Sequence, residues 1–167
     1  SIEHGNLIDA ATARLMAEAG AFLVPTLVTY FKIEELGRAL GFPAVSQRKV
    51  KDVLDAGLAS LEIARDAGVA IGFGTDLLGE THEHQSQEFA IRAQVMTPLE
   101  ILRSATLVNA KLLRREGELG VVAPGALADL LVVDGDPLAD VRLLAEPAKH
   151  LALVMKGGVV ASSRLDG

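Results

Sequence analysis

Residues 68–76, GVAIGFGTD, form a short run of small and branched apolar residues that ends at a carboxylate. An apolar run of this length that starts at a glycine is typical of a strand buried on both faces, as in a parallel sheet. A charged side chain removed from water is destabilising by several kcal/mol unless it is paired, hydrogen-bonded or bound to a metal ion. The run therefore predicts a buried strand, and something must stabilise Asp76 at its end.

Two further strands are expected nearer the N-terminus. One runs through Ile2 and His4, and the other follows AFLVPTLV at residues 21–28, with an interruption at Pro25. Between them, an aspartate that can cap a helix start and a glycine that can end one predict a helix from Asp9 to Gly20. Strand and helix thus alternate from the first residues onward.

The middle of the chain predicts three more helices. Apolar residues recur every three or four positions from Val50 to Ala67, and Gly68 closes this helix. A loop from Leu77 to about Glu83 leads into a helix over Gln85–Ala93. TPLE at 97–100 predicts another helix start, with threonine as the cap, proline in the first turn and glutamate completing a capping box.

Up to about Leu113 the order strand, helix, strand, helix, strand, helix predicts an α/β fold with parallel strands and right-handed crossovers. The remainder changes character. LADLLVVDGDPL, at 127–138, is typical of a strand followed by a turn, and LALVMKGGVVA, at 151–161, of a hairpin that turns at its two glycines. We expect residues 1–115 to form an α/β part and residues 116–167 a small β unit, with the boundary in REGELG at 115–120.

Composition narrows the classes of function. A formal net charge of −6 without a basic patch disfavours nucleic acid and anionic membranes as partners. No apolar run approaches the roughly 18 residues that a membrane span needs. The absence of cysteine leaves His, Asp and Glu as the ligands for any metal ion. The first residues, SIEHGNLID, lack Met and resemble no signal peptide, so we expect the natural N-terminus upstream; with no targeting segment in view, the cytoplasm is the default location.

Two candidate functional residues stand where parallel strands end. His4 closes the first strand and Asp76 the third, and their separation of 72 positions corresponds to two strand-helix units that open on one face. Both residue types suit zinc or a similar divalent ion. Two plainer interpretations remain open, since a histidine at a strand end is often a hydrogen-bonded structural residue and an aspartate after Gly-Thr is often a turn or helix cap.

Six segments in order resemble the C-terminal portion of the amidohydrolase superfamily, especially its prolidase-like and imidazolonepropionase-like members. They are SIEHGNLID, LVPTLV, GVAIGFGTD, TPLEILRSATLVNAKLL, LGVVAPGALADLLVVDGDPLADV and VMKGGVVA. The resemblance covers nearly the whole chain. It implies that the chain holds strands six to eight of a (β/α)₈ TIM barrel and part of a small β-sandwich.

The resemblance also assigns roles to individual residues. His4 matches the strand-six histidine that ligates the more exposed ion of a two-metal site. Asp76 matches the strand-eight aspartate that ligates the more buried ion and accepts a proton from the attacking water. The family's strand-one His-x-His pair, strand-four carboxylated lysine and strand-five histidine have no match here and are expected upstream of Ser1.

HEH at 82–84 and Tyr30 are further candidate functional positions. HEH at 82–84 follows strand eight, so it is not the missing His-x-His pair. His84 is a candidate substrate contact, although an exposed loop histidine is the plainer interpretation. Tyr30 is a second candidate substrate contact, with an aromatic residue of an amphipathic helix start as its alternative.

The resemblance implies a metal-dependent hydrolase that cleaves a C–N bond of a dipeptide-like or cyclic amide substrate with one or two divalent ions, zinc in the first place. A deaminase of the same superfamily is chemically close. A metal-free fragment that associates with itself or complements another chain is the rival from another class. Because two ligands are fewer than the three that hold a catalytic zinc, this polypeptide alone is expected to be inactive. Its open sheet then needs the N-terminal remainder of the barrel or a second copy to cover it.

Overall fold

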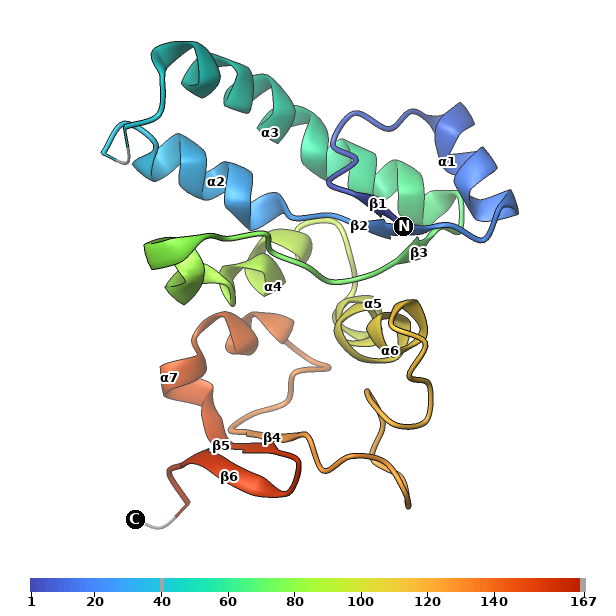
Figure 1. Cartoon of the computed structure of the whole chain (residues 1–167), viewed down its shortest axis with the longest axis vertical. Coiled ribbons are helices and arrows are strands. Elements are labelled where there is room, and N and C mark those ends of the chain that lie inside the picture. The colour runs from blue at the N-terminus through green and yellow to red at the C-terminus, as the bar shows by residue number, and fades with distance from the viewer. Residues whose placement is uncertain (40, 166–167) are drawn as a thin grey trace.

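The computed structural model describes residues 1–39 and 41–165 (Figure 1). Its first sheet has the strand order β1 (Ile2–Glu3), β2 (Phe22–Val24) and β3 (Ala70–Ile71), and both pairings are parallel. Leu23, at the centre of β2, pairs with Ile2 on one side and with Ile71 on the other. The predicted alternation of parallel strands and helices, and with it the α/β class, is confirmed.

Helix α1 (Ala10–Glu18) connects β1 to β2. Its first turn is capped as predicted, because the Asp9 carboxylate accepts a hydrogen bond from the Thr12 amide at 2.7 Å. Gly20 follows the helix with φ +63°, a left-handed conformation that glycine adopts without steric strain. The chain turns there and enters β2.

Two helices connect β2 to β3 and lie side by side in Figure 1, namely α2 (Leu27–Leu36) and α3 (Ala44–Asp66). Helix α3 contains the predicted apolar stripe and begins six residues earlier than the periodicity indicates. It approaches α2 closely at Gly57, where a Cβ atom would lie 2.9 Å from the Leu27 side chain. A glycine at this point lets the two helices pack without a clash.

Strand β3 is shorter than expected, because the run 68–76 pairs with β2 only at Ala70 and Ile71. Its neighbour β2 stops before Pro25, which has no amide hydrogen to continue the ladder. The chain beyond β3 is held by a side chain instead. The Asn109 carboxamide accepts from the Phe73 amide and donates to the Phe73 carbonyl, both at 2.9 Å.

Short helical segments follow β3. They are the 3₁₀ helix η1 (Gly79–His84), α4 (Gln87–Arg92), α5 (Pro98–Arg103), the π-helical turn η2 (Ser104–Val108) and α6 (Asn109–Leu112). The capping box at the start of α5 is confirmed. The Thr97 amide donates to the Glu100 carboxylate at 2.7 Å, and the Glu100 amide donates to the Thr97 hydroxyl at 3.4 Å.

The second sheet is antiparallel, with the order β4 (Leu130–Val133), β5 (Leu151–Lys156) and β6 (Val159–Ser163). The predicted hairpin turns at Gly157 and Gly158, both at positive φ. Between β4 and β5 the chain forms the 3₁₀ helix η3 (Val141–Ala145) and α7 (Pro147–His150). All of β6 is exposed to solvent.

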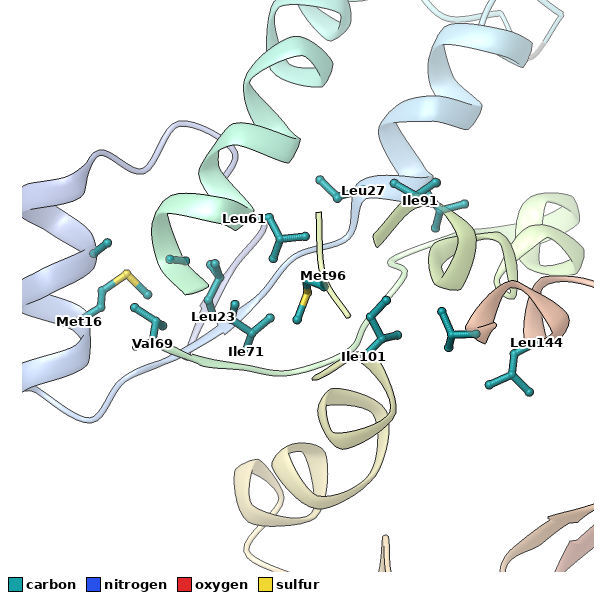
Figure 2. Packing of buried hydrophobic residues seen from close by; sticks show 14 of the residues in the cluster. Met16, Leu23, Leu27, Leu61, Val69, Ile71, Ile91, Met96, Ile101 and Leu144 are labelled. Atoms are coloured by element: carbon teal, nitrogen blue, oxygen red, sulfur yellow. The ribbon is translucent and has the colours of Figure 1, made fainter. Parts of the chain in front are cut away.

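One apolar cluster joins the two ends of the chain (Figure 2). Leu23 and Ile71 contribute from the parallel sheet, and Ile101 contributes from α5. Leu144 of η3 belongs to the same cluster, although it lies beyond the predicted boundary at 115–120. The two predicted parts therefore share a core, and their division into domains stays a prediction.

Two properties of the surface bear on partners. Among the described residues, β1 and β3 each have a partner strand on one side only. Ile2 on β1 is 46% exposed. Nowhere in residues 1–39 and 41–165 does a helix combine the length and the apolar character that crossing a membrane requires.

Candidate metal centre

His4 directly follows β1. Its amide donates to the Val24 carbonyl at 3.0 Å, which continues the parallel ladder by one residue. The backbone then turns, because His4 and Gly5 both have positive φ, at 67° and 64°. His4 is thereby held at the carboxyl end of the strand.

Asp76 lies five residues beyond the last paired residue of β3, at the end of an extended segment. Its backbone has φ 51°, and the preceding carbonyl, that of Thr75, accepts a hydrogen bond from the Thr29 hydroxyl at 2.5 Å. The side chain is 55% exposed. The expectation of a buried strand that ends at Asp76 is wrong in this respect, because Asp76 stands past the paired part of β3 and its side chain is half exposed; its binding of a cation stays a prediction.

The fold brings these two residues together as predicted from their positions at strand ends. His4 Nε2 lies 3.9 Å from Asp76 Oδ2, across 72 positions of sequence. The other ring nitrogen, His4 Nδ1, is 2.8 Å from the Thr26 hydroxyl, and Thr26 is only 3% exposed. One ring nitrogen of His4 is thus held by a hydrogen-bonding partner and the other faces a carboxylate, and both side chains are of types that divalent ions bind.

Backbone strain marks the same two residues. In the described part of the chain, positive φ values occur at three residues other than glycine, namely His4, Asp76 and Arg114. Left-handed backbone is disfavoured for residues with a Cβ, and it persists where surrounding structure enforces it, often at functional sites. Two of the three strained positions thus coincide with the candidate ligands.

Tyr30 packs against His4. The two rings meet edge to face, with centroids 6.1 Å apart and planes at 88°. Burial raises the pKa of the Tyr30 phenol above its ordinary value, and the negative charge of Asp76 raises it further. The hydroxyl is therefore protonated at neutral pH and is able to donate a hydrogen bond there.

Two hollows flank this pair. Asp76 lines one of about 280 Å³, whose walls are largely apolar and include Ile33, Phe42 and Leu77. Lys32 also lines this hollow and is only 7% exposed. Its ammonium group donates a hydrogen bond to the Glu35 carboxylate at 2.6 Å, and this bond lowers the pKa of Glu35. His4 and Tyr30 line the other hollow, of about 430 Å³, which lies beside α1 and α3.

His84 is placed away from the His4–Asp76 pair, in η1. Its Nε2 is 3.8 Å from the Glu83 carboxylate, and its Nδ1 is 3.5 Å from the Gln87 side chain. It lines neither hollow. Within residues 1–39 and 41–165, no three His, Asp or Glu side chains gather closely enough to hold a metal ion, so HEH at 82–84 forms no such cluster.

Sequence reasoning missed a buried ion pair beneath the site. Glu88 and Arg92 of α4 are both 0% exposed, and Arg92 Nε donates to Glu88 Oε1 at 2.6 Å. Burial raises the pKa of Glu88, and the Arg92 charge acts against that rise. An i,i+4 pair of this kind is usually found on a solvated helix face, so the sequence carries no signal that this one is buried.

The chain thus forms a parallel α/β sheet beyond whose strand ends a histidine and an aspartate face each other. The family model described as "Amidohydrolase family" matches residues 1–160, and the chain belongs to this family.

Solved structures agree with this assignment. A crystal structure of an amidohydrolase has 52% sequence identity and a TM-score of 0.95, over 99% of this chain and 40% of that one. A prolidase solved in complex with N-methylphosphonate-L-proline has 50% identity and a TM-score of 0.93, over 98% of this chain and 40% of that one. The resemblance to prolidase-like members is confirmed.

The curated relatives have different activities. An ochratoxinase from Aspergillus niger is 32% identical over 165 residues, which are 95% of this chain and 33% of the relative. An imidazolonepropionase from Nocardia farcinica is 36% identical over 104 residues, 60% of this chain and 23% of that protein. A 5-methylthioadenosine/S-adenosylhomocysteine deaminase from Desulfitobacterium hafniense is 31% identical over 124 residues, 68% of this chain and 28% of that protein. The chain thus spans about a third of the ochratoxinase and less of the other two.

Proposed function

We propose that this chain is the C-terminal part of a metal-dependent hydrolase that cleaves an amide C–N bond. In this proposal residues 1–115 supply strands six to eight of a (β/α)₈ barrel, and residues 116–167 supply part of a small β-sandwich. The parallel order β1-β2-β3 with helical crossovers, followed by an antiparallel sheet, supports the assignment. So does the extent of the match, which is about 40% of the length of similar solved amidohydrolases.

The observation that carries the proposal is the approach of His4 Nε2 to Asp76 Oδ2 at 3.9 Å. Two ligands of one tetrahedral zinc ion, each bonded at about 2.0–2.1 Å, lie about 3.3 Å apart. The donor pair therefore suits divalent ions by atom type, but it is wider than one tetrahedral ion requires, which is compatible with the two ions to which the resemblance assigns His4 and Asp76 separately. Thr26 at the second ring nitrogen adds the outer partner that metal-bound histidines normally have.

His4 and Asp76 would help to hold one or two divalent ions, zinc in the first place, which would supply polarisation of the scissile carbonyl and a lowered pKa of the attacking water. Asp76 accepts a proton from that water as the new C–O bond forms. It then returns the proton to the amide nitrogen as the C–N bond breaks, so the products are a carboxylic acid and an amine. One carboxylate acts as base and then as acid in a single turnover.

The substrate in this proposal is a dipeptide-like or cyclic amide. A prolidase among the similar structures binds a proline phosphonate, which supports a peptide-type amide. Tyr30 is proposed as a substrate contact because its ring packs against His4 and its hydroxyl is protonated. His84 is retained as a second proposed contact, although its neighbours here are Glu83 and Gln87.

His4 and Asp76 are two ligands, and a catalytic zinc site needs three. We propose that the N-terminal remainder of the barrel supplies the others and covers the open sheet. By itself the chain is then inactive. The rival role, a metal-free module that complements another chain or a second copy, differs from the hydrolase in that the purified full-length protein would contain no stoichiometric zinc.

The decisive experiment replaces Asp76 with Asn in the full-length protein and follows hydrolysis of Xaa-Pro dipeptides. We expect turnover to fall at least about 100-fold, because the proton acceptor is lost. Far-ultraviolet circular dichroism is expected to stay unchanged, since the side chain is half exposed. Asp55→Asn, which changes an exposed carboxylate on α3, is the matched control. Normal turnover in Asp76→Asn refutes the proposed role.

Deamination is the second candidate, favoured by the match to a deaminase over 68% of this chain. In that reaction water attacks an amidine-like carbon in place of an amide carbonyl, and ammonia leaves. Release of ammonia from an aminopurine nucleoside, with no cleavage of any dipeptide, would select deamination.

A further inference from the structure

The first turn of α2 is capped in an unusual way. Thr26 occupies the N-cap position, where a threonine hydroxyl normally accepts a hydrogen bond from one of the next amides of the helix. Here the Thr26 side chain makes no such bond. Instead, the Val28 amide donates a hydrogen bond at 2.7 Å to Oε2 of Glu88, which lies 60 positions further along the chain.

The Thr26 hydroxyl is thereby free for another partner, which is His4 Nδ1 at 2.8 Å. Tyr30, one helical turn further along α2, packs edge to face with the same imidazole. The orientation of His4 therefore depends on where the first turn of α2 lies and on what its hydroxyl is bonded to.

The Glu88–Arg92 pair holds the first turn of α2 in place by hydrogen bonds to the backbone. Arg92 donates to the carbonyl of Pro25 at 2.7 Å, directly before Thr26, and Glu88 accepts from Val28, two residues after it. Arg92 also donates to the carbonyl of Gly72 at 2.8 Å, on the segment that leads to Asp76. One buried ion pair thus holds both the backbone around Thr26, which contacts His4, and the segment that leads to Asp76.

Such a pair is a specific arrangement. Burial of two charges is destabilising unless good geometry and further hydrogen bonds compensate for the lost hydration. Here the Arg92 guanidinium also donates to the Ser104 hydroxyl at 3.0 Å and lies 4.5 Å from the centre of the Phe73 ring. Glu88 and Arg92 are therefore fully hydrogen-bonded, and the backbone groups they hold lie directly after β2 and β3, at Pro25 and Gly72, and in the first turn of α2, at Val28.

We infer that Glu88 is a positioning residue for the metal centre: it caps α2 in place of Thr26, so that the Thr26 hydroxyl orients His4 with Nε2 toward the metal position. This inference rests on the proposed role of His4 as a ligand. When Nε2 binds a metal ion, Nδ1 carries the ring proton and donates it to the Thr26 oxygen. Loss of the cap frees the Val28 amide to compete for that oxygen.

The test measures the affinity of the full-length protein for Zn²⁺ by competition with a chelating dye. Thr26→Val is expected to weaken zinc binding about 10- to 100-fold, the effect typical of removing an outer-shell partner, and Thr26→Ser to restore it. Glu88→Gln keeps the shape and an oxygen for Arg92 but turns an NH₂ group toward the Val28 amide. It is expected to weaken zinc binding by no more than Thr26→Val does.

The double variant separates positioning from general destabilisation. If Glu88 acts through Thr26, Glu88→Gln has no further effect in the Thr26→Val background. Equal weakening by Glu88→Gln in both backgrounds overturns the inference, as does unchanged affinity in Thr26→Val. Where Glu88→Gln does not fold, Glu88→Asp replaces it, because it keeps the charge near Arg92 but is too short to reach Val28 as well.

The result also distinguishes this inference from the proposed function. His4→Asn and Asp76→Asn are expected to weaken zinc binding more than any of the variants above. If neither changes it, the proposed metal site is wrong. If both do and the Thr26 and Glu88 variants do not, the positioning inference alone fails.

Discussion

At the scale of single residues, the candidate centre depends on two strained backbone conformations. His4 and Asp76 take left-handed φ values, and histidine and aspartate are among the side chains that tolerate this region best. At these two turns His4 Nε2 and Asp76 Oδ2 come within 3.9 Å of each other. Stability is therefore sacrificed at the positions where side-chain direction matters.

This strain predicts opposite effects on stability and on zinc binding. Arg114 is the third strained residue and follows α6, where glycine is the usual residue. Arg114→Gly is expected to raise the free energy of unfolding by up to about 1 kcal/mol, without effect on zinc binding. Asp76→Gly is expected to raise it by less, since aspartate tolerates the conformation, and to weaken zinc binding. Urea denaturation and zinc titration of both variants test this, and a destabilised Asp76→Gly would contradict it.

The proximity of the two candidate ligands could be predicted from sequence, and their supporting residues could not. His4 and Asp76 follow expected strands, and parallel topology places the carboxyl ends of such strands together. Thr26 and Glu88 carry no local signal, because one resembles an ordinary helix cap and the other a surface i,i+4 partner of Arg92. Their roles arise from a contact between α2 and α4 that only the folded chain contains.

At the scale of elements, local chemistry determines where helices begin. The Asp9 cap and the Thr97 capping box were predicted and are confirmed, because each acts within four residues. The length of β3 was predicted wrongly, since pairing depends on a neighbouring strand that stops before Pro25. Helix α3 extends beyond its apolar stripe because backbone hydrogen bonds from Ser46 and Gln47 to Pro43 start it earlier.

The cap of α1 predicts a pH dependence of stability. Hydrogen bonds from Thr12 lower the pKa of the Asp9 carboxyl below its ordinary value. A carboxyl with a lowered pKa in the folded state stabilises the protein above its unfolded pKa, and this contribution is lost as the pH falls through the folded pKa. Asp9→Asn keeps an acceptor and removes the titration. Unfolding by urea at neutral and acidic pH should therefore show a smaller loss of stability on acidification for Asp9→Asn than for the wild type.

At the scale of the whole molecule, the parallel sheet has open edges. β1 and β3 each lack a second partner strand within residues 1–39 and 41–165, and unpaired edges promote association between chains. We expect this chain on its own to associate with itself, and we expect Ile2→Lys, on edge strand β1, to reduce that association. Val122→Lys, at an 88% exposed position outside the strands, is the control. Sedimentation of the wild-type chain as a monomer at all concentrations would contradict this prediction.

The contact between α4 and η3 connects the C-terminal segment to the helix that carries Glu88 and Arg92. Val141 and Leu144 of η3 lie in the same apolar cluster as Ile91, and Ile91 is the neighbour of Arg92 on α4. Deletion of the residues after Gly120 would uncover the helix whose two charges hold the ends of β2 and β3. A truncation far from His4 and Asp76 in the sequence would therefore weaken metal binding at these two residues.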